Sequence, residues 1–139
     1  MRAALLIMVL VTATACGPSE CQAPTLCQIS QSYHFAITPS VSPPRAREAI
    51  LYKVVIRDRE SRQPIEIGEG QIYASNEERS STWDGFTKAQ QLGTYYGKLN
   101  FVTAGLWAVA IRFRRDSLHP LEKTEWYQDV HNERQAPVP

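Results

Sequence analysis

Residues 93–114, GTYYGKLNFVTAGLWAVAIRFR, constrain the fold more than any other stretch of the chain. Apolar or small residues alternate along two runs within it: Tyr95, Gly97, Leu99 and Phe101, then Trp107, Val109, Ile111 and Phe113. This period-2 alternation is typical of β-strands with one buried face. Residues 103–105 separate the runs, and Gly105 can adopt a positive φ in a tight turn. We therefore expect a β-hairpin on which further strands pack, because an isolated hairpin is marginally stable.

Alternation also predicts strands at residues 33–38, 48–58 and 65–75. Gly68 and Gly70 interrupt the third and suggest a β-bulge or bend. Residues 39–47 hold three prolines and should form a crossing loop. Residues 76–92 lack clear periodicity and should form a long loop, whereas residues 121–130 fit either a strand or a short amphipathic helix.

Short strands at regular intervals, almost without helix signals, predict an all-β chain. We expect an immunoglobulin-like β-sandwich of six to eight antiparallel strands over residues 32–131, followed by a disordered tail at 132–139. Gly93-Thr94-Tyr95 resembles a tyrosine corner, in which a Tyr near the start of the penultimate strand bonds to upstream backbone. Gln91 stands where that motif more usually has Asp, so the match is partial.

The first 15 residues have the pattern of an export signal. Arg2 precedes an uncharged apolar run at residues 3–11, and small residues follow. Ala13-Thr14-Ala15-Cys16 resembles a bacterial lipobox, although Ala13 replaces the usual large aliphatic residue. We expect residues 1–15 to be a lipoprotein signal peptide and Cys16 to be acylated; the alternative is an ordinary signal peptide ending at Ala15. Either way the protein is exported.

The lipobox resemblance implies a membrane-anchored lipoprotein facing the periplasm. Gly17, in place of Asp, favours the outer membrane by analogy with enteric lipoproteins. Residues 16–31 are small and polar and should form the lipidated tether. Cys21 and Cys27 then remain as an even pair and should form a local disulfide around Pro24. Metal binding by these two thiols is the competing interpretation, and the sequence shows no nearby His or second Cys pair.

Charge argues against a nucleic-acid partner. Arg2 is one of 15 Lys and Arg residues and leaves with the signal peptide, so the remaining basic residues equal the 14 Asp and Glu residues. A formally neutral chain has no basic excess with which to bind nucleic acid.

One family resemblance is visible in the hairpin region. Gly93-x-Tyr95, Leu99-x-Phe101, Gly105-x-Trp107 and Val109-x-Ile111 look like the C-terminal half of FixH/YtkA-like exported domains. The resemblance covers roughly residues 48–114, and its motif is mostly structural. It implies an immunoglobulin-like sandwich and, in members tied to cytochrome oxidase assembly, copper handling or a related accessory role.

Copper handling meets a shortage of soft ligands. The only methionines, Met1 and Met8, lie in the expected signal peptide, so the mature chain has no thioether. His34, His119 and His131 are widely spaced, and they are the alternative metal ligands if they converge in space. No cofactor is expected. No serine lies in a G-x-S-x-G motif and no Gly-rich phosphate loop is present, so we expect no enzyme activity.

The expected loop at 76–92 carries the best candidate for a binding site. Trp83, Asp84 and Phe86, with Tyr73 leading in, form an aromatic centre among charged residues, as at protein interfaces. In the alternative, Trp83 or Phe86 caps one end of the core. The leading function is therefore a lipid-anchored module that binds or assembles another envelope protein; the alternative is a copper-handling or maturation accessory of a respiratory or electron-transfer complex.

Overall fold

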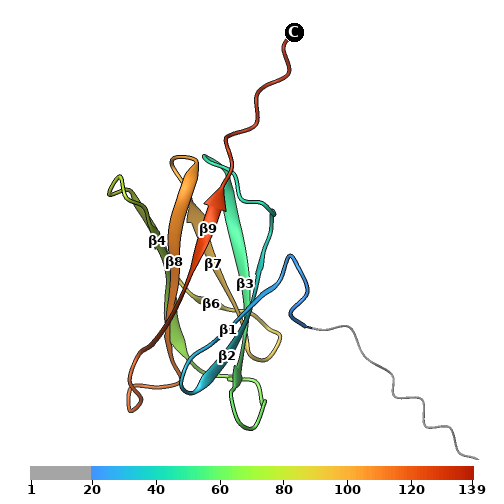
Figure 1. The fold of residues 1–139 in the computed structure, drawn as a ribbon. Helices are drawn as coiled ribbons and strands as arrows, with labels where there is room; N and C mark the ends of the chain where they lie inside the picture. Colours follow the sequence, from blue (N-terminus) through green and yellow to red (C-terminus); the bar gives the residue numbers. More distant parts are fainter. Residues whose placement is uncertain (1–19) are drawn as a thin grey trace, which may run out of the picture.

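The computed structural model describes residues 20–139, and this part of the chain forms nine β-strands and no helix. Figure 1 shows the strands in two sheets packed face to face, with the chain continuing as a tail beyond β9. Because residues 20–139 contain no helix, they contain none that could cross a membrane. The expected signal peptide at residues 1–15 and the expected lipid attachment site Cys16 lie outside the described residues.

One sheet has the order β1-β2-β3-β7-β6 and the other β5-β4-β8-β9, with all neighbours antiparallel. The strands are β1 (Leu26–Ile29), β2 (Tyr33–Pro39), β3 (Ala49–Asp58), β4 (Glu69–Ser75), β5 (Ser81–Gly85), β6 (Thr87–Lys88), β7 (Thr94–Asn100), β8 (Gly105–Arg114) and β9 (Glu122–Val130). The order β2-β3-β7-β6 against β4-β8-β9 matches the A-B-E-D and C-F-G sheets of immunoglobulin-like domains. The predicted all-β sandwich is confirmed, with nine strands because the short β1, β5 and the two-residue β6 are added.

The predicted strand faces form the core. All eight alternating residues of the 93–114 stretch are buried, and the aromatic ones contact one another across the two sheets. The rings of Phe101 and Trp107 meet edge to face with centroids 5.2 Å apart, and those of Tyr95 and Phe113 with centroids 5.4 Å apart. Period-2 alternation therefore identified which side of each strand is buried.

The predicted hairpin is wrong. β7 pairs with β3 and β6, whereas β8 pairs with β4 and β9, so the two strands lie in different sheets. The connection at residues 101–104 crosses from one sheet to the other, and Gly105 has the expected positive φ, at 115°. Alternation shows only that each strand buries one face. Two such strands can lie next to each other in one sheet, or they can lie in different sheets with their apolar faces packed against each other across the core.

Three other boundaries differ from expectation. Residues 26–29, expected in the tether, form β1 on the edge of a sheet. The expected loop at 76–92 contains β5 and β6. β4 begins at Glu69, after a bend at Ile67, and keeps a continuous register with β8, so the predicted interruption is a bend and no bulge is present at Gly70. Residues 121–130, left open between helix and strand, contain β9.

Tyr95 makes a longer-range bond than the tyrosine corner suggested. Its hydroxyl donates to the carbonyl oxygen of Ile65, 2.8 Å away and 30 residues upstream. Its strand, β7, is third from the end of the described strands rather than penultimate. The bond fastens the start of β7 to the segment that leads into β4.

Candidate binding face

The outer face of the β5-β4-β8-β9 sheet carries a group of large exposed apolar side chains. Trp83 on β5 is 69% exposed, Leu106 on β8 is 62% exposed and Tyr127 on β9 is 71% exposed. Trp83 stands directly opposite the half-buried Tyr73 of β4 in the strand register. We call these four residues, Tyr73, Trp83, Leu106 and Tyr127, the aromatic face.

Small residues on β8 leave the middle of this face low. Ala110 stands opposite Tyr73 on one side, and Ala108 stands opposite Tyr127 on the other. Two hollows on this face are open to solvent. One is lined mainly by Tyr73, Ser75, Ser81, Trp83 and Arg112. The other is lined mainly by Ser75, Glu77, Glu78, Leu106, Ala108 and Tyr127.

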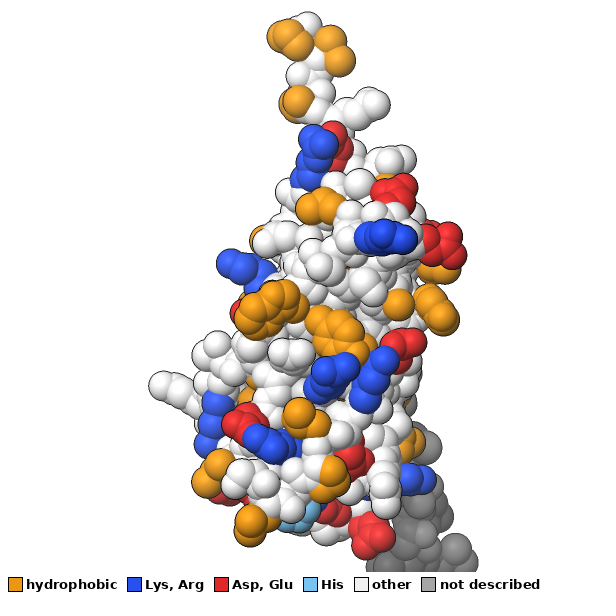
Figure 2. Space-filling model, turned by 90° about the vertical axis from the view of Figure 1, so that its left-hand side faces the viewer, with side chains coloured by type: hydrophobic (Ala, Val, Ile, Leu, Met, Phe, Trp, Pro, Cys, Tyr) orange, Lys and Arg blue, Asp and Glu red, His pale blue; other side chains and the backbone are white. Residues whose placement is uncertain are grey.

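Charged groups of both signs border the aromatic side chains. The guanidinium of Arg112 lies 5.2 Å from the ring centroid of Tyr73, and the ammonium of Lys123 lies 6.0 Å from it, so both cations contact the π-face. Lys123 also pairs with Glu125 at 2.7 Å, and this bond, followed by the contact with Tyr73, raises the pKa of Lys123. Figure 2 shows hydrophobic side chains near the middle of the molecule with Lys or Arg side chains directly beside them.

The structure divides the predicted partner-binding set. Tyr73 and Trp83 lie together on the aromatic face, but Asp84 and Phe86 do not. Asp84 lies on the opposite side of β5, where its Oδ2 accepts the backbone N–H of Lys98 at 2.8 Å. Phe86 packs against the core with its ring 6.1 Å from that of Tyr95. The core-cap alternative therefore holds for Phe86 and is excluded for Trp83.

Side chains of β5 also close the sandwich along one edge. β6 pairs with β7 only at residues 95 and 96, which leaves the rest of that edge of β7 without a strand partner. The backbone N–H groups of Lys98 and Asn100 donate instead to Asp84 Oδ2 and Thr82 Oγ1, at 2.8 and 3.1 Å. Alternation along β5 thus directs Thr82 and Asp84 to β7 and Trp83 to solvent.

The three histidines do not converge. His119 lies in the β8–β9 loop and pairs with Asp116 at 2.7 Å, whereas His131 follows the far end of β9. The nine residues of β9 span about 30 Å at roughly 3.3 Å per residue. His119 and His131 therefore cannot share one ion, and His34 lies buried on β2.

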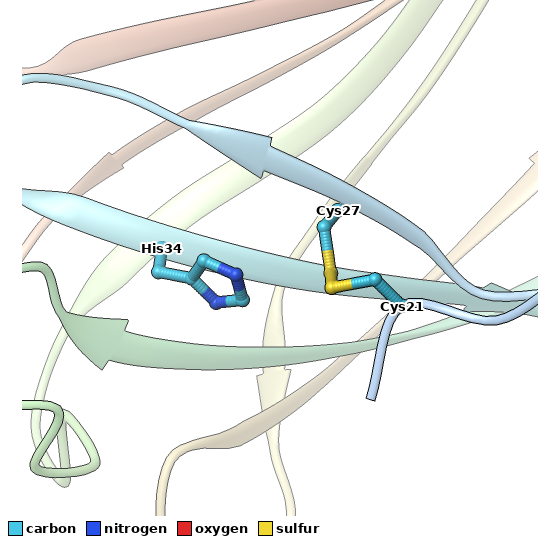
Figure 3. A group of neighbouring side chains, drawn as sticks. All are labelled: Cys21, Cys27 and His34. Carbon is cyan, nitrogen blue, oxygen red and sulfur yellow. A yellow bond between two sulfur atoms is a disulfide. The ribbon is translucent and has the colours of Figure 1, made fainter. Parts of the chain in front are cut away.

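His34 has neighbours that the sequence did not reveal. A disulfide joins Cys21 and Cys27, the pair expected from the cysteine count, with Cα atoms 5.4 Å apart. Two sulfur atoms and one imidazole nitrogen lie within 4.8 Å of one another (Figure 3). The sequence predicts a tether that includes residues 26–29 and therefore does not indicate this cluster, because only the β1–β2 hairpin brings Cys27 beside His34.

Comparisons of this chain with protein-family models, with curated proteins and with solved structures found no match. The FixH/YtkA-like resemblance therefore stays a prediction.

Proposed function

We propose that the protein is a lipid-anchored envelope protein that binds another envelope protein through the aromatic face. One observation carries this proposal: three large apolar side chains, Trp83, Leu106 and Tyr127, are each more than 60% exposed on one face of a rigid sheet. Contact of large apolar side chains with water is unfavourable, and several of them on one face favour an interaction site there.

The composition of the face favours a protein partner. Tyr, Trp and Arg are the residues most enriched at protein interfaces and at their energetic centres. The hollow between Tyr73 and Trp83 offers space for an apolar side chain of the partner. Arg112, Lys123 and Glu125 beside it supply polar groups of both signs for the rim of the contact.

Export and anchoring rest on separate support. A disulfide between Cys21 and Cys27 suits an oxidising compartment outside the cytosol. Lipid on Cys16 remains a proposal from the lipobox resemblance. Several acyl chains would hold the protein firmly at a membrane, since each buried CH₂ contributes about 0.8 kcal/mol.

Partner capture from detergent-solubilised membranes tests the aromatic face. Trp83→Ala should weaken capture by about 2 kcal/mol or more, the range of hot-spot residues, which is roughly 30-fold in Kd. Leu106→Ala should also weaken it. Leu51→Ala provides the matched control, because Leu51 is 43% exposed on the outer face of the other sheet.

The variants should keep the melting temperature of the parent, because truncating exposed side chains removes little buried surface. Capture that survives both Trp83→Ala and Leu106→Ala rules out this face. If Leu51→Ala lost capture to the same extent, the assay would be measuring non-specific binding to exposed apolar side chains, and the result would count against this face.

The second candidate is a copper-handling accessory. The three metal ligands that the sequence suggested for it, His34, His119 and His131, lie apart and cannot bind one ion together. Within residues 20–139 its remaining support is the cluster of Cys21, Cys27 and His34.

A further inference from the structure

The β1–β2 hairpin places a histidine beside a disulfide. Cys27 stands opposite Ala36, and Ile29 stands opposite His34, so Cys27 and His34 lie on the same outer face of the sheet as diagonal neighbours. Residues 20–25 turn back over this face, and the disulfide holds Cys21 there. Figure 3 shows the imidazole of His34 directed toward the two sulfur atoms.

His34 is buried, and one of its two ring nitrogens lacks a hydrogen-bond partner among the described residues. Its side chain is only 5% exposed, and its Nδ1 has no hydrogen-bond partner among residues 20–139. A buried polar atom without a partner costs free energy, and such groups often mark a ligand site. Burial, followed by the charge of Arg62, lowers the pKa of His34, while Glu20 opposes this and Arg57 adds to it. A neutral imidazole offers the lone pair of one ring nitrogen to an ion.

We propose that reduction of the Cys21–Cys27 disulfide turns this cluster into a site for one Cu(I) ion, bound by two thiolates and the imidazole of His34. This inference does not rest on binding by the aromatic face. Thiolate and imidazole donors suit Cu(I), which prefers soft ligands.

The reduction needs a dithiol reductant, such as the reduced Cys pair of a thioredoxin-like protein. The reductant passes two electrons and two protons to the S–S bond, forms its own disulfide and leaves Cys21 and Cys27 as thiols. Cys21 is exposed and so is open to attack by the incoming thiolate. Cu(I) then displaces the two thiol protons to solvent, whereas neutral His34 binds without losing a proton.

The separations fit a shared ion. Bonds of about 2.3 Å to sulfur and about 2.0 Å to nitrogen place donors of one ion roughly 3.5–4.5 Å apart. The donor atoms already lie within 4.8 Å of one another, and the two sulfur atoms need only part once their bond opens. Arg57 and Arg62 act on His34 as neighbouring positive charges, whereas Glu20, which pairs with Arg57, acts on it in the opposite sense.

Anaerobic titration with Cu(I) against a chromophoric Cu(I) chelator tests the site, using the full chain in detergent with Cys16→Ser, which leaves no sulfur at position 16 whether or not Cys16 is acylated. The reduced protein should bind one Cu(I) per chain, with near-ultraviolet thiolate-to-copper absorption, and the oxidised protein should bind none. Cys27→Ser should abolish binding. His34→Gln should weaken it by more than about tenfold, the least that loss of even an outer partner of a ligand costs.

His119→Gln and His131→Gln are the matched histidine controls and should bind Cu(I) as the parent does. A second measurement needs no variant at these sites: Cu(I) should protect Cys21 and Cys27 of the reduced protein from alkylation. Absence of protection overturns the proposal, as does tight Cu(I) binding in a folded His34→Gln variant. Stoichiometric preference for Zn²⁺ over Cu(I) would also overturn it.

Discussion

Trp107 is the residue whose truncation should damage the sandwich most. Its side chain is fully buried on the inner face of β8, where it packs edge to face on Phe101. Its indole N–H also donates to the carbonyl oxygen of Thr103, 3.0 Å away. We expect Trp107→Ala to lower the free energy of unfolding by about 3–5 kcal/mol.

The magnitude follows from the surface that the indole removes from water. A buried Trp removes roughly 200 Å², which at about 25 cal/mol per Å² is an upper value of about 5 kcal/mol. The aromatic contact adds about 0.5–1.5 kcal/mol. Residual burial in the unfolded chain and partial collapse of the cavity subtract from this sum. The loss is a large share of the roughly 5–15 kcal/mol that stabilises a domain.

Urea unfolding followed by far-ultraviolet circular dichroism measures the change without depending on Trp fluorescence. Trp83→Ala is the matched control, because the same side chain is 69% exposed there and its loss should change the free energy of unfolding by less than about 0.5 kcal/mol. Trp107→Phe keeps an aromatic ring and should cost less than Trp107→Ala. An unchanged midpoint in Trp107→Ala, or equal losses in the two Ala variants, would refute the assigned strand faces.

Three further changes test other parts of the molecule. A hydrogen bond from Arg115 holds the pKa of Asp58 below its ordinary range, so this stabilisation is present above about pH 3.9 and is lost as the pH falls further. Asp58→Asn should therefore lower the melting temperature at pH 7, and the difference from the parent should narrow below about pH 4; a constant difference would contradict the ion pair. Tyr95→Phe leaves the Ile65 carbonyl oxygen without its buried donor and should lower the free energy of unfolding, measured in urea, by about 1–3 kcal/mol. An unchanged free energy of unfolding would show that this hydrogen bond is absent. Cys16→Ser should yield an uncleaved precursor or a protein in the soluble fraction, and unaltered processing with membrane fractionation would disprove lipidation.

The alternation of apolar residues predicted the sandwich but not the pairing of its strands. Side-chain period is a local property, and it correctly assigned the buried faces of β7 and β8. Pairing depends on which strands lie beside each other in the complete fold. The short connection between Asn100 and Gly105 therefore suggested a hairpin, although it crosses between sheets.

Of the four residues of the aromatic face, the sequence suggested only Tyr73 and Trp83, and the reason is related. The sequence predicts Trp83 as a candidate contact together with Asp84 and Phe86, its near neighbours in the chain. Strand geometry turns successive residues to opposite faces, so Trp83 gains Tyr73 as its true neighbour. Tyr127 and Leu106 come from strands far along the chain, and no local pattern connects them to Trp83.

The two proposed sites lie on different surfaces, which lets each be tested alone. The Cys21–Cys27–His34 cluster lies on the outer face of the β1-β2-β3-β7-β6 sheet, and the aromatic face is the outer face of the other sheet. Cys16 precedes Cys21 by five residues, a reach of at most about 18 Å at 3.6 Å per residue. A lipid on Cys16 would thus keep the cluster near the membrane, whereas the aromatic face, on the opposite side of the sandwich, stays open to a partner. Binding of that partner need not hinder a reductant that reaches Cys21.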